Sequence, residues 1–190
     1  MNLSMIEAKK QIRSEVKLFK NSFSYEQLKE KSITIFNIIN SLPEVRLANY
    51  ILSYWSLNDE VHTHDWNKKQ LLLNKNILLP SVKDNDLEIR YFEGEDKMTI
   101  KEPFGIKEST GKILNDLSKI EVVLVPGLAF DEKFHRLGRG KGYYDRFLVK
   151  TNALKIGICF DFQLYKHIPH DIYDVEMDII VSEKSFLKKH

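Results

Sequence analysis

The sequence predicts a single α/β domain over residues 1–190, with a mostly parallel central sheet flanked by helices in a three-layer α/β/α arrangement. Short apolar segments of strand length recur at 121–130, 155–160 and 178–182, and segments with helical periodicity alternate with them. A chain of 190 residues has the usual length of one compact domain. It contains no internal repeat and no linker-like change in composition, so one domain is expected.

Two helices are predicted at the start of the chain. In the first, apolar residues recur at spacings of three and four: Met5, Ala8, Ile12, Val16 and Phe19. A basic stripe lies beside this apolar face and consists of Lys9, Arg13 and Lys17. The second helix begins after Ser24, which forms a capping-box pattern with Gln27, and Phe23 with Leu28 fits a hydrophobic staple. This helix should end before Pro43.

The next part of the chain predicts a strand, a helix and two further strands. Residues 47–55 are rich in aromatic and β-branched side chains, which favours a buried strand. A helix should follow, with Thr63 as its N-cap. Residues 76–80 and 87–92 each predict a strand, whereas the polar stretch 94–111, which proline and glycine interrupt, is predicted to be irregular.

The strongest prediction of a central strand falls on 121–130, where β-branched residues dominate until Pro126 and Gly127 interrupt the run. In a parallel sheet, ligands bind in the crevice beyond the carboxyl ends of the strands. The loop after Val125 is therefore the place where we expect the functional site.

Composition argues against several classes of protein. Apolar residues make up 43% and charged residues 29%, which favours a folded soluble chain over a disordered one. The formal net charge of +2 is too small to predict binding to nucleic acid. Cys159 is the only cysteine and has apolar neighbours, so we expect a buried thiol and a reducing, cytoplasmic location. No apolar run has the length of a signal or a membrane span, and no membrane partner is expected.

Three glycines, Gly138, Gly140 and Gly142, alternate with Arg139 and Lys141 just before a segment of helix-compatible composition. Glycine allows backbone angles that direct several amide protons toward one oxygen cluster, and a helix amino terminus adds partial positive charge. This pattern is typical of a phosphate site. It is neither a Walker A loop, because no serine or threonine follows Lys141, nor the dinucleotide fingerprint, whose last glycine is missing. The glycines alone would equally fit a flexible turn with solvated cations.

The residues around these glycines extend the pattern. The stretch VPGLAFDEKFHRLGRGKGYYDRFL, at 125–148, closely resembles the signature of the 5-formyltetrahydrofolate cyclo-ligase family, in which PGxAFD leads into RLGxGxGYYDRfL. Weaker resemblances occur in the family's order in KKQIR, SYWSLNDEVHT, FDFQ and IPHDIYDVEMD, and together they span almost the whole chain. Two departures stand out: Phe134 occupies a position where glycine is common, and PFGIKEST at 103–110 lacks an acidic-proline pair.

The resemblance implies an ATP-dependent enzyme that converts 5-formyltetrahydrofolate, with or without a polyglutamate tail, into 5,10-methenyltetrahydrofolate. We expect the enzyme to be a monomer. The residues that the family pattern assigns to ATP are Lys9, Lys10, Gln11, Ile12, Arg13, Arg136, Leu137, Gly138, Arg139, Gly140, Lys141, Gly142, Tyr143 and Tyr144. Those that it assigns to the folate are Arg13, Trp55, Glu60, Arg139, Gly140, Lys141, Gly142 and Tyr143. The residues expected to take part in catalysis are Arg139, Lys141 and Tyr143. The resemblance also implies Mg²⁺ as a cofactor, bound by Asp145 and Asp178.

The chemistry of several residues suits the assigned role. Lys9 and Arg13 lie one helical turn apart, so their cations can meet one phosphate. The Glu60 carboxylate suits the adjacent amino and ring N–H donors of a pterin, and the Trp55 ring could pack against a flat ligand. Each residue also has an ordinary structural interpretation: a solvated basic stripe, a loop acid, a core tryptophan and, for Asp145, a pair with a nearby arginine.

Three other functions stay open on the residues alone. His62 and His64 alternate as zinc ligands can, although no third ligand follows at a familiar spacing. A different nucleotide-dependent transferase or ligase could share the phosphate loop and take another acceptor. A non-catalytic module could hold RNA or a phosphorylated ligand through the same basic residues.

Overall fold

A seven-stranded sheet forms the centre of the computed structural model, which describes residues 3–101 and 106–189. Its strands lie in the order β12, β11, β9, β6, β1, β2 and β3. In that order their bounds are Phe186–Lys188, Ile179–Val181, Leu154–Ile158, Val122–Pro126, Tyr50–Leu52, Asn76–Lys83 and Asp86–Tyr91. The five inner strands are parallel, and β3 and β12 run antiparallel to their neighbours at the two edges.

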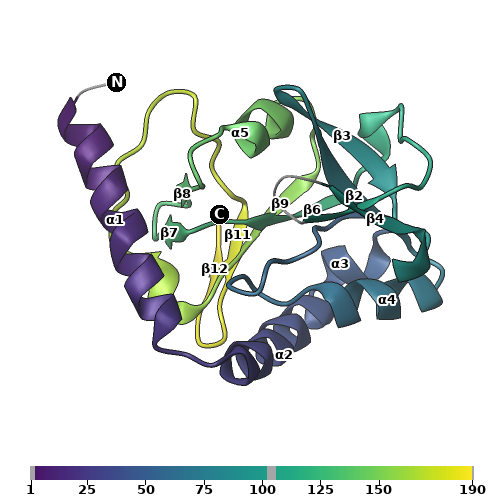
Figure 1. Ribbon diagram of the computed structural model, residues 1–190, viewed down its shortest axis with the longest axis horizontal. Helices are drawn as coiled ribbons and strands as arrows, with labels where there is room; N and C mark the ends of the chain where they lie inside the picture. The colour runs from purple at the N-terminus through teal and green to yellow at the C-terminus, as the bar shows by residue number, and fades with distance from the viewer. Residues whose placement is uncertain (1–2, 102–105, 190) are drawn as a thin grey trace.

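Helices cover both faces of the sheet (Figure 1). One face carries α2 (Tyr25–Ser41), α3 (Pro43–Leu47) and α4 (His64–Leu72), and the other carries α5 (Tyr143–Leu148). Alternate strand residues supply two hydrophobic cores, because successive side chains of a strand point to opposite faces. Ile77 and Leu79 of β2 pack in the core that α2 joins, whereas Leu78 packs in the core that holds Phe147 of α5. The predicted three-layer arrangement with a mostly parallel sheet is confirmed.

The strands predicted at 76–80 and 87–92 are present as β2 and β3, but they form a hairpin. Only Asp84 and Asn85 join them, which is too short for the crossover that a parallel neighbour needs. Asp84 takes φ 54, a left-handed conformation that aspartate tolerates in tight turns. The hairpin therefore ends the parallel part of the sheet on this side.

The segment 94–111, predicted to be irregular, contains an antiparallel pair of strands, β4 (Met98–Lys101) and β5 (Ile106–Ser109). The prediction was wrong because these strands are short and largely polar, so they show no clear alternation of apolar residues. Glu108 fastens the pair to β2, since its carboxylate accepts a hydrogen bond from Ser81 Oγ.

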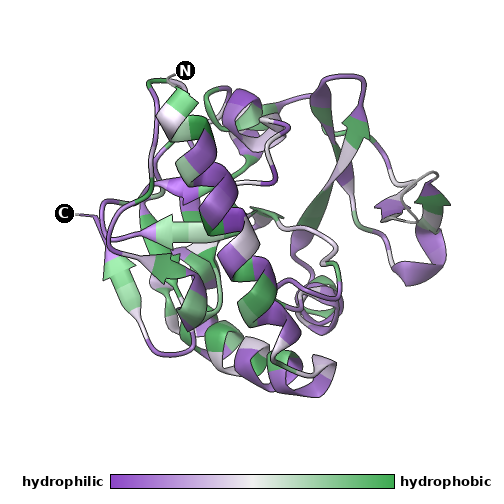
Figure 2. Cartoon of the chain, turned by 60° about the vertical axis from the view of Figure 1, so that its left-hand side comes forward, coloured by the Kyte–Doolittle hydropathy of each residue, from purple (hydrophilic) through white to green (hydrophobic). Residues whose placement is uncertain are grey.

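A smaller three-stranded sheet carries the amino-terminal helix. Its strands, in spatial order, are β10 (Leu164–Tyr165), β7 (Ala129–Asp131) and β8 (Arg136–Leu137). Helix α1 (Leu3–Asn21) packs against it through Val16, whose side chain is fully buried. Figure 1 shows α1 along one side of the molecule, and Figure 2 shows that it carries both hydrophilic and hydrophobic residues along its length.

The inner face of α1 differs from the predicted one. Phe19, predicted on the apolar stripe, is 53% exposed, and Lys17 of the predicted basic stripe is exposed as well. Lys9 and Lys20 are buried instead. A buried ammonium group needs a carboxylate partner, so this face of α1 does more than pack against apolar residues.

Most helix boundaries follow the predicted caps. The capping box between Ser24 and Gln27 is present, and α2 ends before Pro43 as predicted. Thr63 is the N-cap of α4 by position, but its hydroxyl donates to Tyr54 O (2.5 Å) and caps no helix amide. In the described part of the chain, the remaining helical elements are three single turns: η1 (Glu95–Lys97), η2 (Leu117–Lys119) and η3 (Asp161–Gln163).

The departure at Phe134 has a conformational explanation. Phe134 takes φ 68, in the left-handed region that favours glycine. Its amide donates to Asp131 O (2.9 Å) and its carbonyl oxygen accepts from Met177 N (2.8 Å), which holds the turn between β7 and β8. The second departure, PFGIKEST, begins at 103–105, outside the described residues.

Cys159 is buried, as predicted, and burial raises the pKa of its thiol well above the usual range. Within residues 3–101 and 106–189, no helix is both long enough and apolar enough to cross a bilayer.

Candidate active site

A cavity of about 580 Å³ opens at the carboxyl ends of β1, β2 and β6. Residues at these strand ends line it: Tyr54 and Trp55 after β1, Val82 near the end of β2, and Gly127 and Leu128 after β6. Helix α1 and the glycine-rich segment supply the other walls. The cavity therefore lies at the edge of the sheet where the sequence predicted a functional site.

The glycine-rich segment runs from β8 into α5 along the cavity. Gly140 has φ +100 and Gly142 has φ +68, conformations that strain any residue with a Cβ atom. Arg13 of α1 clamps the segment, because its Nε donates to Gly138 O (3.1 Å). The segment thus takes a conformation that needs its glycines, and it is held against α1.

Only part of the basic run in α1 reaches the cavity. Lys9 and Arg13 line it. Lys10 and Gln11 are exposed, and Ile12 packs against the hydrophobic cluster between α1 and the small sheet. Successive residues of a helix point about 100° apart, so only positions about one turn apart share a face. Lys10, Gln11 and Ile12, which were also predicted to contact ATP, therefore do not line this cavity.

Lys9 is paired with an acid that the sequence did not single out. Its Nζ lies 2.7 Å from Asp174 Oδ2, and both residues line the cavity. Burial lowers the pKa of Arg13, and the charge of Asp174 opposes this shift. Asp174 therefore balances part of the positive charge that α1 brings to the cavity.

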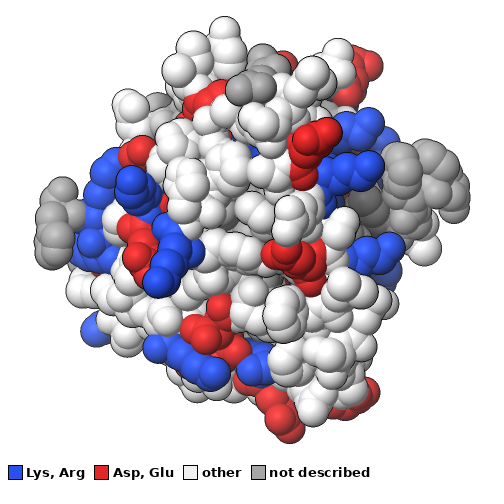
Figure 3. Space-filling view, turned by 90° about the vertical axis from the view of Figure 1, so that its left-hand side faces the viewer, with Lys and Arg blue, Asp and Glu red and all other residues white. Residues whose placement is uncertain are grey.

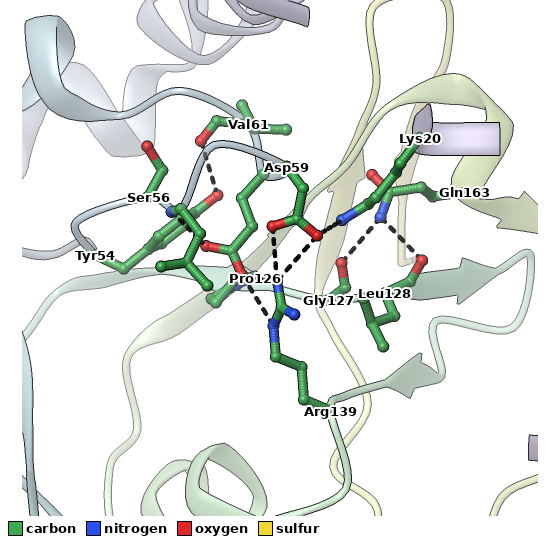
Figure 4. A network of polar contacts seen from close by, with 12 residues as sticks. Lys20, Tyr54, Ser56, Asp59, Val61, Pro126, Gly127, Leu128, Arg139 and Gln163 are labelled. Atoms are coloured by element: carbon green, nitrogen blue, oxygen red, sulfur yellow. Dashed lines mark hydrogen bonds and ion pairs between the residues drawn. The ribbon is translucent and has the colours of Figure 1, made fainter. Parts of the chain in front are cut away.

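Arg139 makes ion pairs with two neighbouring acids (Figure 4). Its Nη2 lies 2.9 Å from Asp59 Oδ1 and 3.0 Å from Glu60 Oε1. Lys20 Nζ contacts the same aspartate, 3.1 Å from Oδ2. Burial alone would raise the pKa of Asp59, but Lys20 and Arg139 outweigh it and hold this pKa below its usual range. Burial would lower the pKa of Arg139, but Glu60 and Asp59 outweigh it and raise this pKa.

Glu60, predicted to bind the folate, lines the cavity with its side chain 15% exposed. Its Oε2 accepts a hydrogen bond from Leu57 N (3.1 Å), while Oε1 contacts Arg139. The backbone contact fixes the carboxylate in place. Arg139 occupies the oxygen that a ligand donor would otherwise meet.

Trp55 lines the cavity and belongs to an aromatic stack. Its ring lies over His64, with 3.9 Å between centroids and 12° between planes, and 5.5 Å from Phe92. Burial lowers the pKa of His64 to about 4, so this ring is neutral at pH 7. Trp55 therefore packs against the core and also forms part of the cavity wall, and its contact with the folate stays a prediction.

The zinc hypothesis for His62 and His64 finds no support. Their ring centroids lie 4.5 Å apart, but His62 packs edge-on against Tyr25 and His64 stacks on the tryptophan. Among the residues that the structure describes, no three His, Cys, Asp or Glu side chains are grouped to hold a metal ion.

Arg136 and Asp145 form an ion pair on the cavity wall, with 2.7 Å between Nη2 and Oδ1. The Arg136 guanidinium also lies over the Tyr144 ring, 5.6 Å from its centroid. Two buried polar atoms here, Arg136 Nε and Tyr144 Oη, have no hydrogen-bond partner within the described part of the chain. Burial raises the pKa of Tyr144. The arginine pair that we considered for Asp145 is thus what the structure contains.

Asp178 does not reach this site. It precedes β11 and so lies at the amino-terminal edge of the sheet, opposite the cavity. Its Oδ2 accepts a hydrogen bond from Lys155 N (2.8 Å) and lies 2.8 Å from Lys155 Nζ. The predicted magnesium pair of Asp145 and Asp178 is therefore not brought together, because Asp145 of α5 lines the cavity at the carboxyl-terminal edge of the sheet and Asp178 lies at the amino-terminal edge.

Two residues predicted for catalysis differ in their surroundings. Tyr143 lines the cavity, and the Arg146 guanidinium lies 5.3 Å from its ring centroid. Lys141 lines the cavity and is exposed, and its ammonium contacts no residue within 3–101 or 106–189. Lys141 is therefore available to a ligand.

Sequence reasoning missed Lys20, Asp59 and Asp174. Lys20 follows Arg13 by seven residues, two helical turns, so helix geometry placed it on the same face. Asp59 stands beside Glu60, and Asp174 lies within a recognised motif. Each was detectable as a candidate, but only the fold shows which carboxylate meets which cation.

Comparison with known proteins identifies the family. The family model described as the 5-formyltetrahydrofolate cyclo-ligase family matches residues 5–183. The chain is 32% identical to a probable 5-formyltetrahydrofolate cyclo-ligase of Schizosaccharomyces pombe, over 83% of this chain and 86% of that protein. It is 28% identical to 5-formyltetrahydrofolate cyclo-ligase of Haemophilus influenzae, over 91% of this chain and 97% of that protein.

A solved structure supports the same family. The NMR structure of Aquifex aeolicus 5,10-methenyltetrahydrofolate synthetase superposes with a TM-score of 0.84 at 30% identity, covering 95% of this chain and 92% of that one. The fold, the matched length and the glycine-rich segment together show that this chain belongs to the 5-formyltetrahydrofolate cyclo-ligase family.

Proposed function

We propose that this protein uses ATP to convert 5-formyltetrahydrofolate into 5,10-methenyltetrahydrofolate, with ADP and phosphate as the other products. The observation that carries this proposal is one cavity with two chemically different parts. One set of its lining residues consists of cations and glycines, and the other includes the Trp55 ring and the Glu60 carboxylate. Such a cavity suits a phosphorylated ligand and a flat, partly polar ligand at the same time.

The cationic part suits the phosphates of ATP. Lys9, Arg13, Arg139 and Lys141 line it from α1 and the glycine-rich segment, whose backbone adds amide donors. Phosphoryl transfer depends mainly on positioning and on neutralising charge, and these groups supply both. Lys141, which has no partner in the described part of the chain, is the cation most accessible to a phosphate.

The other part suits the folate. Trp55 offers a ring held by its stack on His64, and Glu60 offers a carboxylate fixed by Leu57 N. A pterin with adjacent N–H donors would share the Glu60 carboxylate with Arg139. Arg139 would keep its contacts with Asp59 and Glu60 and direct its remaining nitrogen, Nη1, toward the phosphate group.

In the proposed reaction the formyl oxygen attacks the γ-phosphorus of ATP, an O–P bond forms, and ADP leaves. The nitrogen at position 10 then attacks the formyl carbon and loses its proton, and the C–O bond breaks as phosphate leaves with the electron pair. Phosphorylation is required because an amide oxygen is a poor leaving group. Arg139 and Lys141 would balance the charge on the transferred group, and Tyr143, which lines the same cavity, would border both ligands.

The family resemblance implies Mg²⁺, but the predicted pair of carboxylates does not fit it. Asp178 lies across the sheet from the cavity, and Asp145 is already paired with Arg136. Mg²⁺ therefore enters the proposal only as the companion of the ATP phosphates, and no step is assigned to a metal held by two carboxylates. Asp145 is the one predicted metal ligand that lines the cavity.

The near-ultraviolet absorbance of methenyltetrahydrofolate tests the proposal. We expect absorbance to grow when purified protein meets 5-formyltetrahydrofolate with Mg-ATP, and to stay flat when ATP is omitted. Protein shown to be folded by circular dichroism that gives a flat trace with ATP would contradict the proposed reaction. Binding of ATP without binding of folate would point to another acceptor.

No observation favours the RNA-binding module. Two of the cations that it would use are already paired, Lys9 with Asp174 and Arg139 with Asp59 and Glu60. Figure 3 shows acidic and basic side chains interspersed on the face that carries α1. Binding through backbone charge would need a larger surplus of cations on one face.

A further inference from the structure

Lys20, in the last turn of α1, is a buried cation without a role in the proposed reaction. Its side chain is 4% exposed and does not line the cavity. Its ammonium has one partner within the described residues, Asp59, at 3.1 Å. Burial lowers the pKa of Lys20, and Asp59 opposes this shift. Because removing an ammonium from water is costly, its retention beside a single carboxylate points to a specific task.

Asp59 connects Lys20 to Arg139. Arg139 Nη2 donates to both oxygens of Asp59, at 2.9 Å and 3.2 Å, and Oδ2 also accepts from Lys20. The carboxylate is therefore held between two cations that come from α1 and from the glycine-rich segment (Figure 4). Any change at Lys20 must alter the position or the charge balance of Asp59 first.

Arg139 is in turn fixed on one side. Its Nε and Nη2 contact Glu60 Oε1, at 3.4 Å and 3.0 Å, in addition to the contacts with Asp59. The third nitrogen, Nη1, has no hydrogen bond to any described residue, and Figure 4 shows no contact there. A guanidinium group is planar and rigid, so fixing Nε and Nη2 also fixes the direction in which Nη1 donates.

We propose that Lys20 and Asp59 are positioning residues, which hold Arg139 so that its Nη1 donates to an acceptor oxygen of a ligand in the cavity. This inference rests on the proposed function, in which Arg139 contacts the reacting groups. Lys20 itself touches no ligand and acts only through Asp59 and Arg139. A purely structural Lys20 would instead tie α1 to the 57–60 loop, and its effect would not depend on Arg139.

Hydrogen exchange in the ligand-free protein tests the first step. Lys20→Met keeps the bulk of the side chain and removes its charge, so we expect the fold to survive. The amides of 138–142 should exchange several-fold faster in this variant. The matched control is Lys31→Met, because Lys31 pairs with Glu183 at 2.6 Å and does not line the cavity. Unchanged exchange in Lys20→Met would overturn the proposal.

A double-mutant cycle on kcat/KM for 5-formyltetrahydrofolate tests the second step. We expect Lys20→Met to lower kcat/KM by about tenfold to 100-fold, the effect of a small misplacement near the reacting groups. In an Arg139→Ala background the same change should have no further effect. Lys20→Arg should recover most of the activity. Equal losses in both backgrounds would show a structural role and refute the inference.

Asp59→Asn gives the same test without altering Lys20. It should lower kcat/KM in the wild-type background and have no further effect beside Arg139→Ala. Failure of the proposed function would look different from failure of this inference. A wild type without ATP-dependent product refutes the reaction, while exchange at 138–142 still decides whether Lys20 holds the segment. An active wild type with an additive cycle refutes the inference alone.

Discussion

The two edges of the central sheet use charged side chains differently. At the amino-terminal edge, charged side chains form hydrogen bonds with backbone groups. Glu121 Oε2 accepts the amide hydrogens of Asn49 (2.6 Å) and Tyr50 (2.8 Å), and Lys75 Nζ donates to three carbonyl oxygens within 45–48. These contacts join elements that lie side by side in the fold and complete the hydrogen bonding of their backbone.

At the carboxyl-terminal edge, charges from distant parts of the chain meet around the cavity and leave donors unused. Arg136 Nε is buried without a partner in the described residues, and the ammonium of Lys141 contacts none of them. Buried polar groups are normally satisfied, so unsatisfied donors beside a cavity mark a place prepared for a ligand. The difference separates charges that stabilise the fold from charges that bind.

The largest expected effect compares one acid from each edge. Asp145→Asn should lower kcat/KM with Mg-ATP by about 100-fold, because Arg136 loses its carboxylate on the cavity wall. Asp178→Asn should leave kcat/KM within about twofold, because its contacts to Lys155 lie across the sheet. Steady-state kinetics on both variants decides this. Similar losses for the two would break the comparison between the edges.

A second comparison uses two glutamates. Glu60→Gln should weaken binding of 5-formyltetrahydrofolate by about 1.5 to 3 kcal/mol, the contribution of a hydrogen bond to a charged group. It should change the affinity for ATP much less, because Asp59 still holds Arg139, and Glu121→Gln at the other edge should alter neither affinity. Calorimetric titration with each ligand provides the measurement. Equal losses for ATP and folate would remove Glu60 from the folate site.

Stability should show the opposite pattern. Glu121→Gln should lower the free energy of unfolding by about 1 to 2 kcal/mol, because an amide oxygen accepts the two backbone hydrogen bonds less strongly than a carboxylate. Activity measured below the unfolding transition should stay unchanged. Denaturant unfolding followed by circular dichroism checks the stability. A loss of activity without a loss of stability would contradict the structural role of this edge.

The smallest effect concerns the stack beneath the cavity. His64 has a folded-state pKa of about 4, below the usual 6.5, so the folded protein favours the neutral ring. The stability that this shift contributes is complete above pH 6.5 and is lost as pH falls toward 4. We expect a loss of about 1 kcal/mol, since the ring is only half-buried and solvent screens its charge. In His64→Gln the melting temperature should fall less over the same range, and an identical fall would assign the effect to other groups.

Much of the fold followed from local patterns. The short apolar runs predicted the central strands, and the Ser24 and Gln27 pattern predicted where α2 begins. The site at the end of β6 followed from the rule that parallel strands end at ligand crevices. These features depend on residues that are close together in the sequence, so one sequence is enough to predict them.

The remaining features depend on contacts between distant residues. The pairing of Lys20 with Asp59 joins α1 to the 57–60 loop, and the pairing of Lys9 with Asp174 joins α1 to a segment near the other end of the chain. Resemblance to a family pattern assigned Asp178 to a metal, but the direction of β11 places it at the wrong edge. Such assignments depend on the direction of a strand and on the face of a helix that carries the residue. A local motif shows neither.

The path of the formyl oxygen tests most directly the claim that one cavity joins ATP to the formyl group. The measurement uses 5-formyltetrahydrofolate carrying a heavy oxygen isotope in its formyl group, with mass spectrometry of the inorganic phosphate after one turnover with Mg-ATP. We predict that the label appears in phosphate, because the C–O bond breaks after the oxygen has been phosphorylated. Label released into water, with unlabelled phosphate, would contradict phosphorylation of the folate in this cavity.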